Sequence, residues 1–174
     1  MELWDLYTQD RQRTGLFHTR GVRMPEGYYR LVVHVCIFNS RGELLIQERK
    51  KTKSVWPGFF DISAGGSAIA GDTSAAAASR ELYEELGLRR SFREGGALLS
   101  ICFENGFDDY YLLREDVAIS DLRLQEEEVE SARYATKEEV LALIDEGRFV
   151  PYQKPLIELL FTSAEVGHAH ILRL

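Results

Sequence analysis

The feature that most constrains the fold is the stretch from residue 65 to residue 88, GGSAIAGDTSAAAASRELYEELGL. A glycine pair opens it, and a loop of small residues leads into an alanine-rich segment of high helix propensity. Asp72 or Thr73 can supply the side-chain oxygen that caps the first turn, and Gly87 can take the left-handed conformation that ends a helix. The pattern predicts a loop followed by a helix over residues 73–86.

The predicted helix has one apolar face and one acidic face. At about 100° per residue, Glu81, Glu84 and Glu85 fill an arc beside the apolar one. Carboxylates at this spacing repel one another, and oxygen ligands of this kind suit Mg²⁺ or Mn²⁺. Glutamate-rich helices also commonly mark a solvated face. The expected core-facing side chains are Ala75, Ala78, Ser79, Leu82 and Leu86.

The flanking residues decide between these two interpretations. The stretch resembles the Nudix box of Nudix hydrolases, Gly-x5-Glu-x7-Arg-Glu-U-x-Glu-Glu-x-Gly-U, in which U is aliphatic. One position departs, because Asp72 stands where the family has its first glutamate. Its side chain is one methylene shorter, which leaves the geometry of the loop open. The matching positions are Gly66, Arg80, Glu81, Leu82, Glu84, Glu85, Gly87 and Leu88.

Composition is that of an ordinary globular protein and predicts one domain over residues 1–174. The 174 residues are 45% hydrophobic and 28% charged, and the net charge of −7 argues against nucleic acid as the main partner. Cys36 and Cys102 lie alone in apolar runs, which predicts two buried thiols and a reducing compartment. No signal peptide or membrane span is evident, so we expect a cytoplasmic protein without a membrane partner. A homodimer is the commonest assembly for such a chain.

Alternation and turn residues predict the remaining elements. Residues 1–29 form an N-terminal β extension, with a hairpin over residues 3–7 and 16–19. Thr136 and Glu139 make a capping box that starts a helix ending near Gly147, and Pro155 begins a last helix through about residue 163. Strand pairs flanked by helices give an α/β/α sandwich with a central mixed sheet, in agreement with the fold that the resemblance implies. Further strands are expected at residues 30–39, 43–49, 60–64, 97–104, 110–116 and 129–134.

A wider resemblance, from Trp4 through LLIQER and WPGFFD, is to a Nudix subgroup similar to isopentenyl-diphosphate isomerase. That isomerase has an essential cysteine on the strand before the box, and the matching position here is about Ala64. Since this chain lacks the thiol and keeps the box, the local chemistry favours hydrolysis.

The resemblance implies roles for the box residues. Glu84 and Glu85 correspond to metal ligands, assisted by the carbonyl of Gly65, and Glu81 to a metal ligand or general base. Arg80 corresponds to the cation that holds these carboxylates in position. Many members add an acidic residue from a loop near the penultimate strand. Glu126, Glu127 and Glu128 are the candidates here; we choose Glu128, and a solvated acidic turn is the alternative.

Substrate contacts are expected from the segment around WPGFF. Arg49, with Lys50, Lys51 and Lys53, forms the one basic cluster of an acidic chain, and such side chains bind phosphate oxygens. Trp56 and Phe59 are candidates for stacking on a base. The alternatives are an exposed basic loop and aromatic side chains that only pack.

These features together predict a Nudix hydrolase that uses Mg²⁺ or Mn²⁺ and acts on phosphoric anhydride bonds. The specific expectation is a pyrophosphohydrolase that cleaves a nucleoside diphosphate linked to another moiety. Two alternatives remain: an isopentenyl-diphosphate isomerase-like enzyme, and an inactive sensor of a nucleotide or sugar phosphate. The identity of the small-molecule diphosphate lies in loops that one sequence does not decode.

Overall fold

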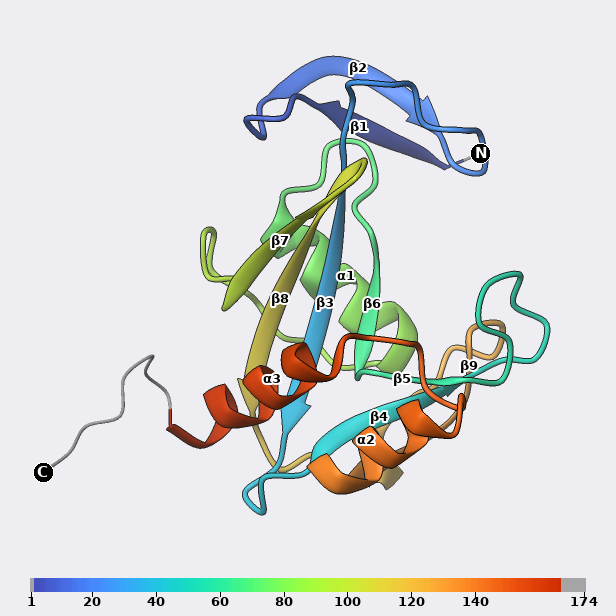
Figure 1. Ribbon diagram of the computed structural model, residues 1–174, viewed down its shortest axis with the longest axis vertical. Helices are drawn as coiled ribbons and strands as arrows, with labels where there is room; N and C mark the ends of the chain where they lie inside the picture. Colours follow the sequence, from blue (N-terminus) through green and yellow to red (C-terminus); the bar gives the residue numbers. More distant parts are fainter. Residues whose placement is uncertain (1, 167–174) are drawn as a thin grey trace, which may run out of the picture. The chain divides into compact units, whose positions relative to one another are not determined.

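The chain forms an α/β structure around a mixed central sheet, with nine strands, three α-helices and a 3-10 turn at Ile119–Asp121 (Figure 1). These counts apply to residues 2–166, the part described by the computed structural model. The strands are β1 (Leu3–Tyr7), β2 (Arg13–Thr19), β3 (Arg30–Phe38), β4 (Leu44–Arg49), β5 (Phe60–Asp61), β6 (Ala64–Ser67), β7 (Leu99–Phe103), β8 (Gly106–Arg114) and β9 (Val129–Ala135). The helices are α1 (Ser74–Leu86), α2 (Lys137–Asp145) and α3 (Lys154–Val166).

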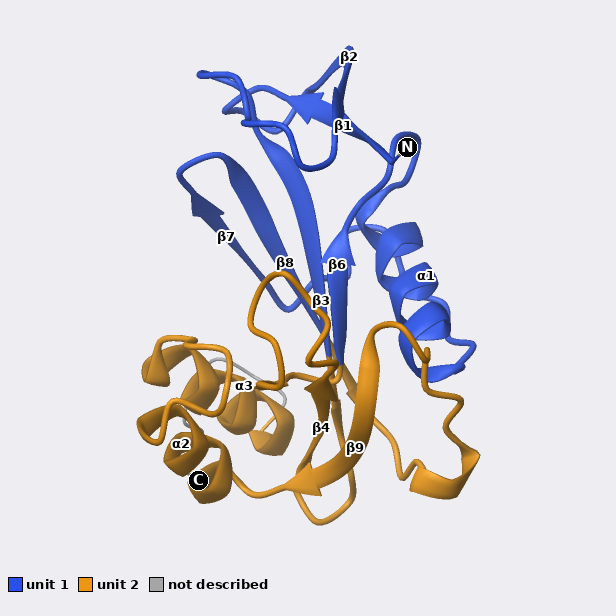
Figure 2. Cartoon of the chain, turned by 90° about the vertical axis from the view of Figure 1, so that its right-hand side faces the viewer, with its two compact units in different colours: residues 1–35, 64–111 blue, residues 36–63, 112–174 orange. Residues whose placement is uncertain are grey.

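The chain divides into two compact units (Figure 2). Unit 1 contains residues 1–35 and 64–111, and unit 2 contains residues 36–63 and 112–174. Strands β3 and β8 each begin in unit 1 and end in unit 2. A single domain over residues 1–174 stays a prediction, and residues 167–174 lie outside the described part.

In unit 1, β6 pairs antiparallel with β3, from Val32 opposite Ser67 to Val35 opposite Ala64. Strand β8 also neighbours β3, and β7 pairs antiparallel with β8. Helix α1 packs beside β6, which delivers the chain to the helix through a short loop. The predicted helix is confirmed, and the glycine pair lies within β6 rather than after a strand, so that strand, loop and helix follow one another without a break.

In unit 2, β4 lies between β5 and β9, and both partners are antiparallel to it. Leu44, Leu45 and Ile46 at the start of β4 are fully buried. The predicted capping box is present at the start of α2, where Thr136 accepts from the Glu139 N–H and the Glu139 side chain accepts from the Thr136 N–H. Helix α3 continues to Val166, beyond the predicted end.

The N-terminal extension is the predicted hairpin, with its second strand starting earlier, at Arg13. On the edge of β1 away from β2, Tyr7 and Tyr29 exchange backbone hydrogen bonds of 2.8 and 2.9 Å. The Leu3 carbonyl accepts from the Ala70 N–H at 2.8 Å, within the loop before α1. The hairpin is thus bonded directly to the stretch that organises the sequence.

One expectation about the strands and one about the cysteines were wrong. The predicted strand over residues 60–64 is broken in two, because the buried Ser63 hydroxyl donates to the Leu45 carbonyl at 2.6 Å and accepts from the Ile37 N–H at 2.8 Å. Cys36 is buried as predicted, but Cys102 is exposed. It lies on β7, whose only strand partner within residues 2–166 is β8, so the edge of that pair leaves the thiol uncovered.

A buried aspartate joins the hairpin to the first residue of α1. Asp109 on β8 is 1% exposed and accepts from both terminal nitrogens of the Arg11 guanidinium. The Ser100 hydroxyl donates to it at 2.5 Å, and the Ser74 hydroxyl donates to its other oxygen. Burial opposes ionisation of Asp109, but the hydrogen bonds from Arg11, Ser100 and Ser74 outweigh it and hold its pKa below the ordinary value.

We expect Asp109→Asn to lower the free energy of unfolding by about 2 kcal/mol at pH 7, because it removes the charge from these hydrogen bonds. A lowered folded-state pKa stabilises the protein above the unfolded pKa of about 4, and this contribution is lost as the pH falls through the folded value. The difference in the free energy of unfolding between wild type and variant should therefore become smaller at acid pH. Urea unfolding at pH 7 and below pH 4 measures it. The exposed Asp121→Asn variant is the control, and an equal loss there would contradict the assignment.

Candidate active site

Helix α1 ends at the predicted residue, Leu86, and begins one residue later than predicted. The Thr73 hydroxyl, rather than Asp72, accepts from the Ala76 N–H at 3.1 Å, so Thr73 is the cap and Ser74 the first helical residue. Gly87 has φ 73° and its N–H donates to the Tyr83 carbonyl at 2.9 Å. Ser79, predicted to be buried, is only partly so, and its hydroxyl donates to the Ala75 carbonyl. The buried residues are Ala75, Ala77, Ala78, Leu82, Glu85 and Leu86.

Both residues of the pair on β6 have to be glycine, because other groups lie close to their backbone. A Cβ on Gly65 would lie 2.8 Å from the Val33 carbonyl oxygen and 3.2 Å from His34 Nδ1. A Cβ on Gly66 would overlap the carboxylate of Glu81. Only residues without a side chain allow β6 to lie this close both to β3 and to the acidic face of α1.

Arg80 holds the acidic face together. Its Nη1 donates to Glu81 Oε1 at 2.8 Å and to Glu84 Oε2 at 3.0 Å. Its Nη2 donates to the Ser67 carbonyl at 3.1 Å and to Asp72 Oδ2 at 2.9 Å. One guanidinium thus offsets the repulsion between carboxylates and connects α1 to both ends of the loop before it.

The shorter side chain of Asp72 does not break this arrangement. Asp72 Oδ2 accepts from Arg80 Nε at 3.0 Å as well as from Nη2. One oxygen of the carboxylate therefore accepts charge-assisted hydrogen bonds from two nitrogens of the Arg80 guanidinium.

The three helix carboxylates differ in environment. Glu85 is 5% exposed and accepts from the Gly65 N–H at 3.1 Å. Burial raises the pKa of Glu81, although the charge and hydrogen bond of Arg80 oppose the change. Burial also disfavours the charged form of Arg80, but Glu81 and Asp72 outweigh it and raise its pKa. The Glu84 side chain is 45% exposed, so it can turn away from Arg80 at small cost.

The donor types at this site fit a hard divalent cation. Glutamate carboxylates and a backbone carbonyl are the oxygen ligands that Mg²⁺ and Mn²⁺ prefer. Within residues 2–166, no group of three or more histidine, cysteine, aspartate or glutamate side chains is already arranged to hold a metal. Because Glu81 and Glu84 are both bonded to Arg80, a cation would have to replace part of that ion pairing.

The other predicted site residues belong to unit 2, where ion pairs occupy most of them. Lys53 and Glu128 form a salt bridge with each other. Arg49 Nη1 lies 3.1 Å from Asp61 Oδ2, and the Tyr152 hydroxyl donates to the other oxygen of Asp61 at 2.9 Å. Arg49, Lys53 and Glu128 therefore each have an oppositely charged partner within their own unit.

The loop between β4 and β5 presents an aromatic pair. Trp56 is 41% exposed and has φ 51°, an uncommon backbone conformation for a bulky residue. Its ring centroid lies 5.5 Å from that of Phe59, whose N–H donates to the Trp56 carbonyl at 3.3 Å. The loop thus exposes a large aromatic surface at the expense of backbone strain.

Sequence reasoning missed two groups of side chains near the box. His34 Nε2 lies 3.2 Å from Asp108 Oδ1, and the imidazole stacks on Tyr110 at 4.5 Å, against the backbone of Gly65. Asp5 in β1 accepts from the Gly71 N–H at 2.8 Å. Asp108 and Asp109, two adjacent acidic residues in a mostly apolar strand, were a weak signal for the first group, and nothing in the local sequence signals the second.

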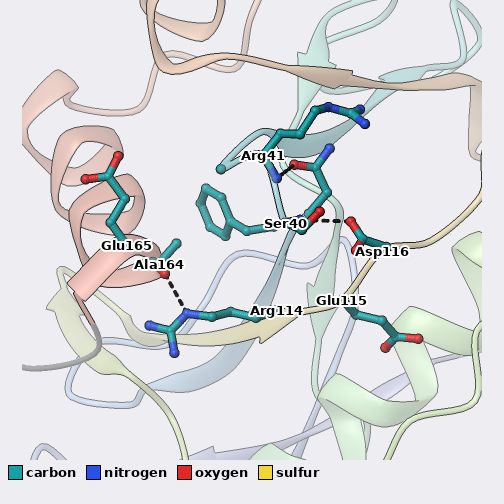
Figure 3. Close-up of a pocket in the computed structure, with 10 residues that line it drawn as sticks. Ser40, Arg41, Arg114, Glu115, Asp116, Ala164 and Glu165 are labelled. Atoms are coloured by element: carbon teal, nitrogen blue, oxygen red, sulfur yellow. Dashed lines mark hydrogen bonds between the residues drawn. The ribbon is translucent and has the colours of Figure 1, made fainter.

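A separate cavity of about 530 Å³ lies in unit 2, beside the turn between β3 and β4 (Figure 3). Its polar groups hold chain segments together. Asp116 accepts from the Ser40 N–H at 2.8 Å, and Arg114 donates to the carbonyls of Ser163 and Ala164 at the end of α3. The cavity lining therefore closes a turn and caps a helix, and it contains no residue predicted for the site.

The chain is similar to known proteins of one family. The model of the NUDIX domain family matches residues 28–160. An uncharacterised Nudix hydrolase of Listeria monocytogenes is 51% identical over 152 residues, which cover 87% of this chain and 90% of that protein. One from Pseudomonas aeruginosa is 42% identical over 119 residues, 68% of each chain. The crystal structure of DR0079 from Deinococcus radiodurans has a TM-score of 0.74 at 27% identity, covering 91% of this chain and 97% of that one.

Within residues 2–166, no helix is both long and apolar enough to cross a membrane. The family model spans most of the chain and includes the whole loop and helix of the box. The chain therefore belongs to the Nudix family and is a hydrolase of diphosphate bonds.

Proposed function

We propose that this protein is a metal-dependent pyrophosphohydrolase that cleaves a nucleoside diphosphate linked to another moiety. The observation that supports the proposal best is the set of carboxylates on α1, Glu81, Glu84 and Glu85, ordered by Arg80 and by the Gly65 N–H. A solvated acidic face would need neither the buried Glu85 nor a glycine placed where Glu81 requires room.

Glu84 and Glu85, with the Gly65 carbonyl, would hold Mg²⁺ or Mn²⁺, and Glu81 would be either a further ligand or the general base. The bound cation would neutralise charge on the phosphoryl oxygens and lower the pKa of an attacking water. Glu81, whose pKa is raised by burial, is the carboxylate best suited to accept a proton from that water. Arg80 keeps Glu81 and Glu84 oriented. Attack on phosphorus breaks the bond to the bridging oxygen, which leaves with the second phosphate.

We assign substrate binding to the loop between β4 and β5. Trp56 and Phe59 would stack on a base, which the exposed and strained Trp56 supports. Arg49 and Lys53 would contact phosphate, and each would have to exchange its present partner, Asp61 or Glu128. Glu128 could bind a cation only if Lys53 releases it.

The isomerase alternative is weakened by Ala64, which is fully buried on β6 and carries no group that could move a proton. The sensor alternative is weakened by the complete set of box carboxylates. A cytoplasmic location, one domain and a homodimer remain parts of the proposal.

Removal of divalent metal should abolish turnover. We expect a panel of nucleotide sugars, dinucleotides, coenzyme-type diphosphates and nucleoside diphosphates to give at least one substrate with Mg²⁺ or Mn²⁺ and none in excess EDTA. Phosphate released after a coupled phosphatase step measures the rate. Isopentenyl diphosphate belongs in the same panel, with product analysis for dimethylallyl diphosphate. Hydrolysis at an undiminished rate in EDTA, or isomerisation without hydrolysis of any compound, would contradict the proposal.

A further inference from the structure

We propose that Asp5, in the N-terminal hairpin, is a positioning residue for the metal-binding carboxylates of α1; this inference rests on the proposed function. Asp5 lies far from the box in sequence, yet it is 8% exposed and bonded to the box loop. Its effect would pass through the loop of residues 67–73 to Arg80, and from Arg80 to Glu81 and Glu84.

The first step is the bond between Asp5 and the loop. Asp5 Oδ2 accepts from the Gly71 N–H at 2.8 Å, and a carboxylate acceptor makes this bond charge-assisted. Gly71 has φ 93°, so the loop turns here in a conformation that glycine alone adopts easily. The Leu3 carbonyl accepts from the adjoining Ala70 N–H. Strand β1 therefore satisfies two consecutive loop amides.

Arg13 makes a second connection from the same hairpin. Its Nη2 donates to the backbone carbonyl of Asp72, and its Nε donates to the Tyr7 hydroxyl at 3.2 Å. Arg13 Nε also lies 3.5 Å from Asp5 Oδ2. Asp5 thus bonds the loop directly and also holds the cation that bonds it one residue further on.

The loop in turn fixes the positions of the carboxylates through Arg80. Ser67 and Asp72, one at each end of the loop, are the two acceptors for Arg80 Nη2. Arg80 is in turn the donor to Glu81 and Glu84. If the turn at Gly71 loosens, Asp72 loses its fixed position first, and the orientation of Arg80 follows.

The test uses the apo protein and Mn²⁺ alone, so it needs no substrate. In Asp5→Ala, the Arg80 Nε–H signal in ¹⁵N NMR, assigned by its loss in Arg80→Lys, should exchange with water about 10-fold faster than in wild type. The Kd for Mn²⁺, titrated by EPR, should rise about 10-fold, as for the loss of other outer-shell supports. Asp10→Ala, an exposed carboxylate in the turn of the same hairpin, should change neither value.

Asp5→Asn keeps a side-chain acceptor for Gly71 but loses the charge, so we expect changes of about 3-fold in the same direction. If Asp5→Ala does not fold, the measurements on Asp5→Asn test the inference. A folded variant whose Arg80 exchange rate and Mn²⁺ affinity equal those of wild type would overturn the inference, as would equal changes in Asp10→Ala. Failure of wild type to bind Mn²⁺ would contradict the proposed function instead. The exchange rate of the Arg80 Nε–H would still test whether Asp5 positions Arg80.

Discussion

Replacing Glu85 with glutamine is expected to lower kcat at least about 100-fold while the protein stays folded. The amide oxygen of glutamine can still accept from the Gly65 N–H, so the buried contact between α1 and β6 survives. The negative charge that would hold the metal is lost. Glu84→Gln should act in the same way, because its exposed side chain contributes little to stability beyond its pair with Arg80.

These variants are measured by kcat on the best compound of the panel, with circular dichroism and urea unfolding to confirm the fold. Glu158→Gln is the matched control, since it removes one exposed carboxylate from the middle of α3. If kcat of both box variants stayed within a few-fold of wild type, the carboxylates of α1 would not take part in catalysis. A comparable loss in Glu158→Gln would show that helix charge in general, rather than the box, is responsible.

Gly66→Ala should separate activity from stability. Its new Cβ would overlap the carboxylate of Glu81, which is the far end of a flexible side chain and can move away. We therefore expect a stability loss of only about 1 kcal/mol. Because displacement of a catalytic group by about 1 Å can cost about 100-fold in rate, kcat should fall by that order.

Gly65→Ala and Gly71→Ala are the comparison variants. At residue 65 the Cβ would meet the Val33 backbone oxygen, which cannot move alone, so stability should suffer more than in Gly66→Ala. At residue 71 nothing lies within 4 Å, and the cost is the left-handed backbone alone. Urea unfolding and kcat measured together distinguish the three. A Gly66→Ala variant with normal kcat would show that Glu81 is not required where the structure places it.

Local signals predicted the loop and helix of the box well. The Thr73 cap, the Gly87 stop and the apolar stripe of α1 all depend on residues within a few positions of one another. The same holds for the capping box at Thr136 and for the first strand of the hairpin. Such features follow from backbone geometry and hydrogen bonds that a short segment makes with itself.

Contacts between distant segments were the ones missed. The break at Ser63 depends on Leu45 and Ile37, and the exposure of Cys102 depends on which strands neighbour β7. Glu128 is paired with Lys53. The sequence had suggested Glu128 as a metal ligand and Lys53 as a phosphate contact, each independently of the other. Propensity and spacing do not specify these pairings, because each side chain must first be brought close by the sheet.

The sequence by itself determined the family, the α/β fold and the acidic face of α1, because the box is a contiguous pattern whose every position has a local or chemical reason. Only the tertiary structure decided what holds that face in place. Ser67 and Asp72 accept hydrogen bonds from Arg80, and Asp5 accepts one from Gly71 in the loop between them. A hydrogen bond between segments more than 60 residues apart, such as the one from Gly71 to Asp5, leaves no periodic trace in either segment.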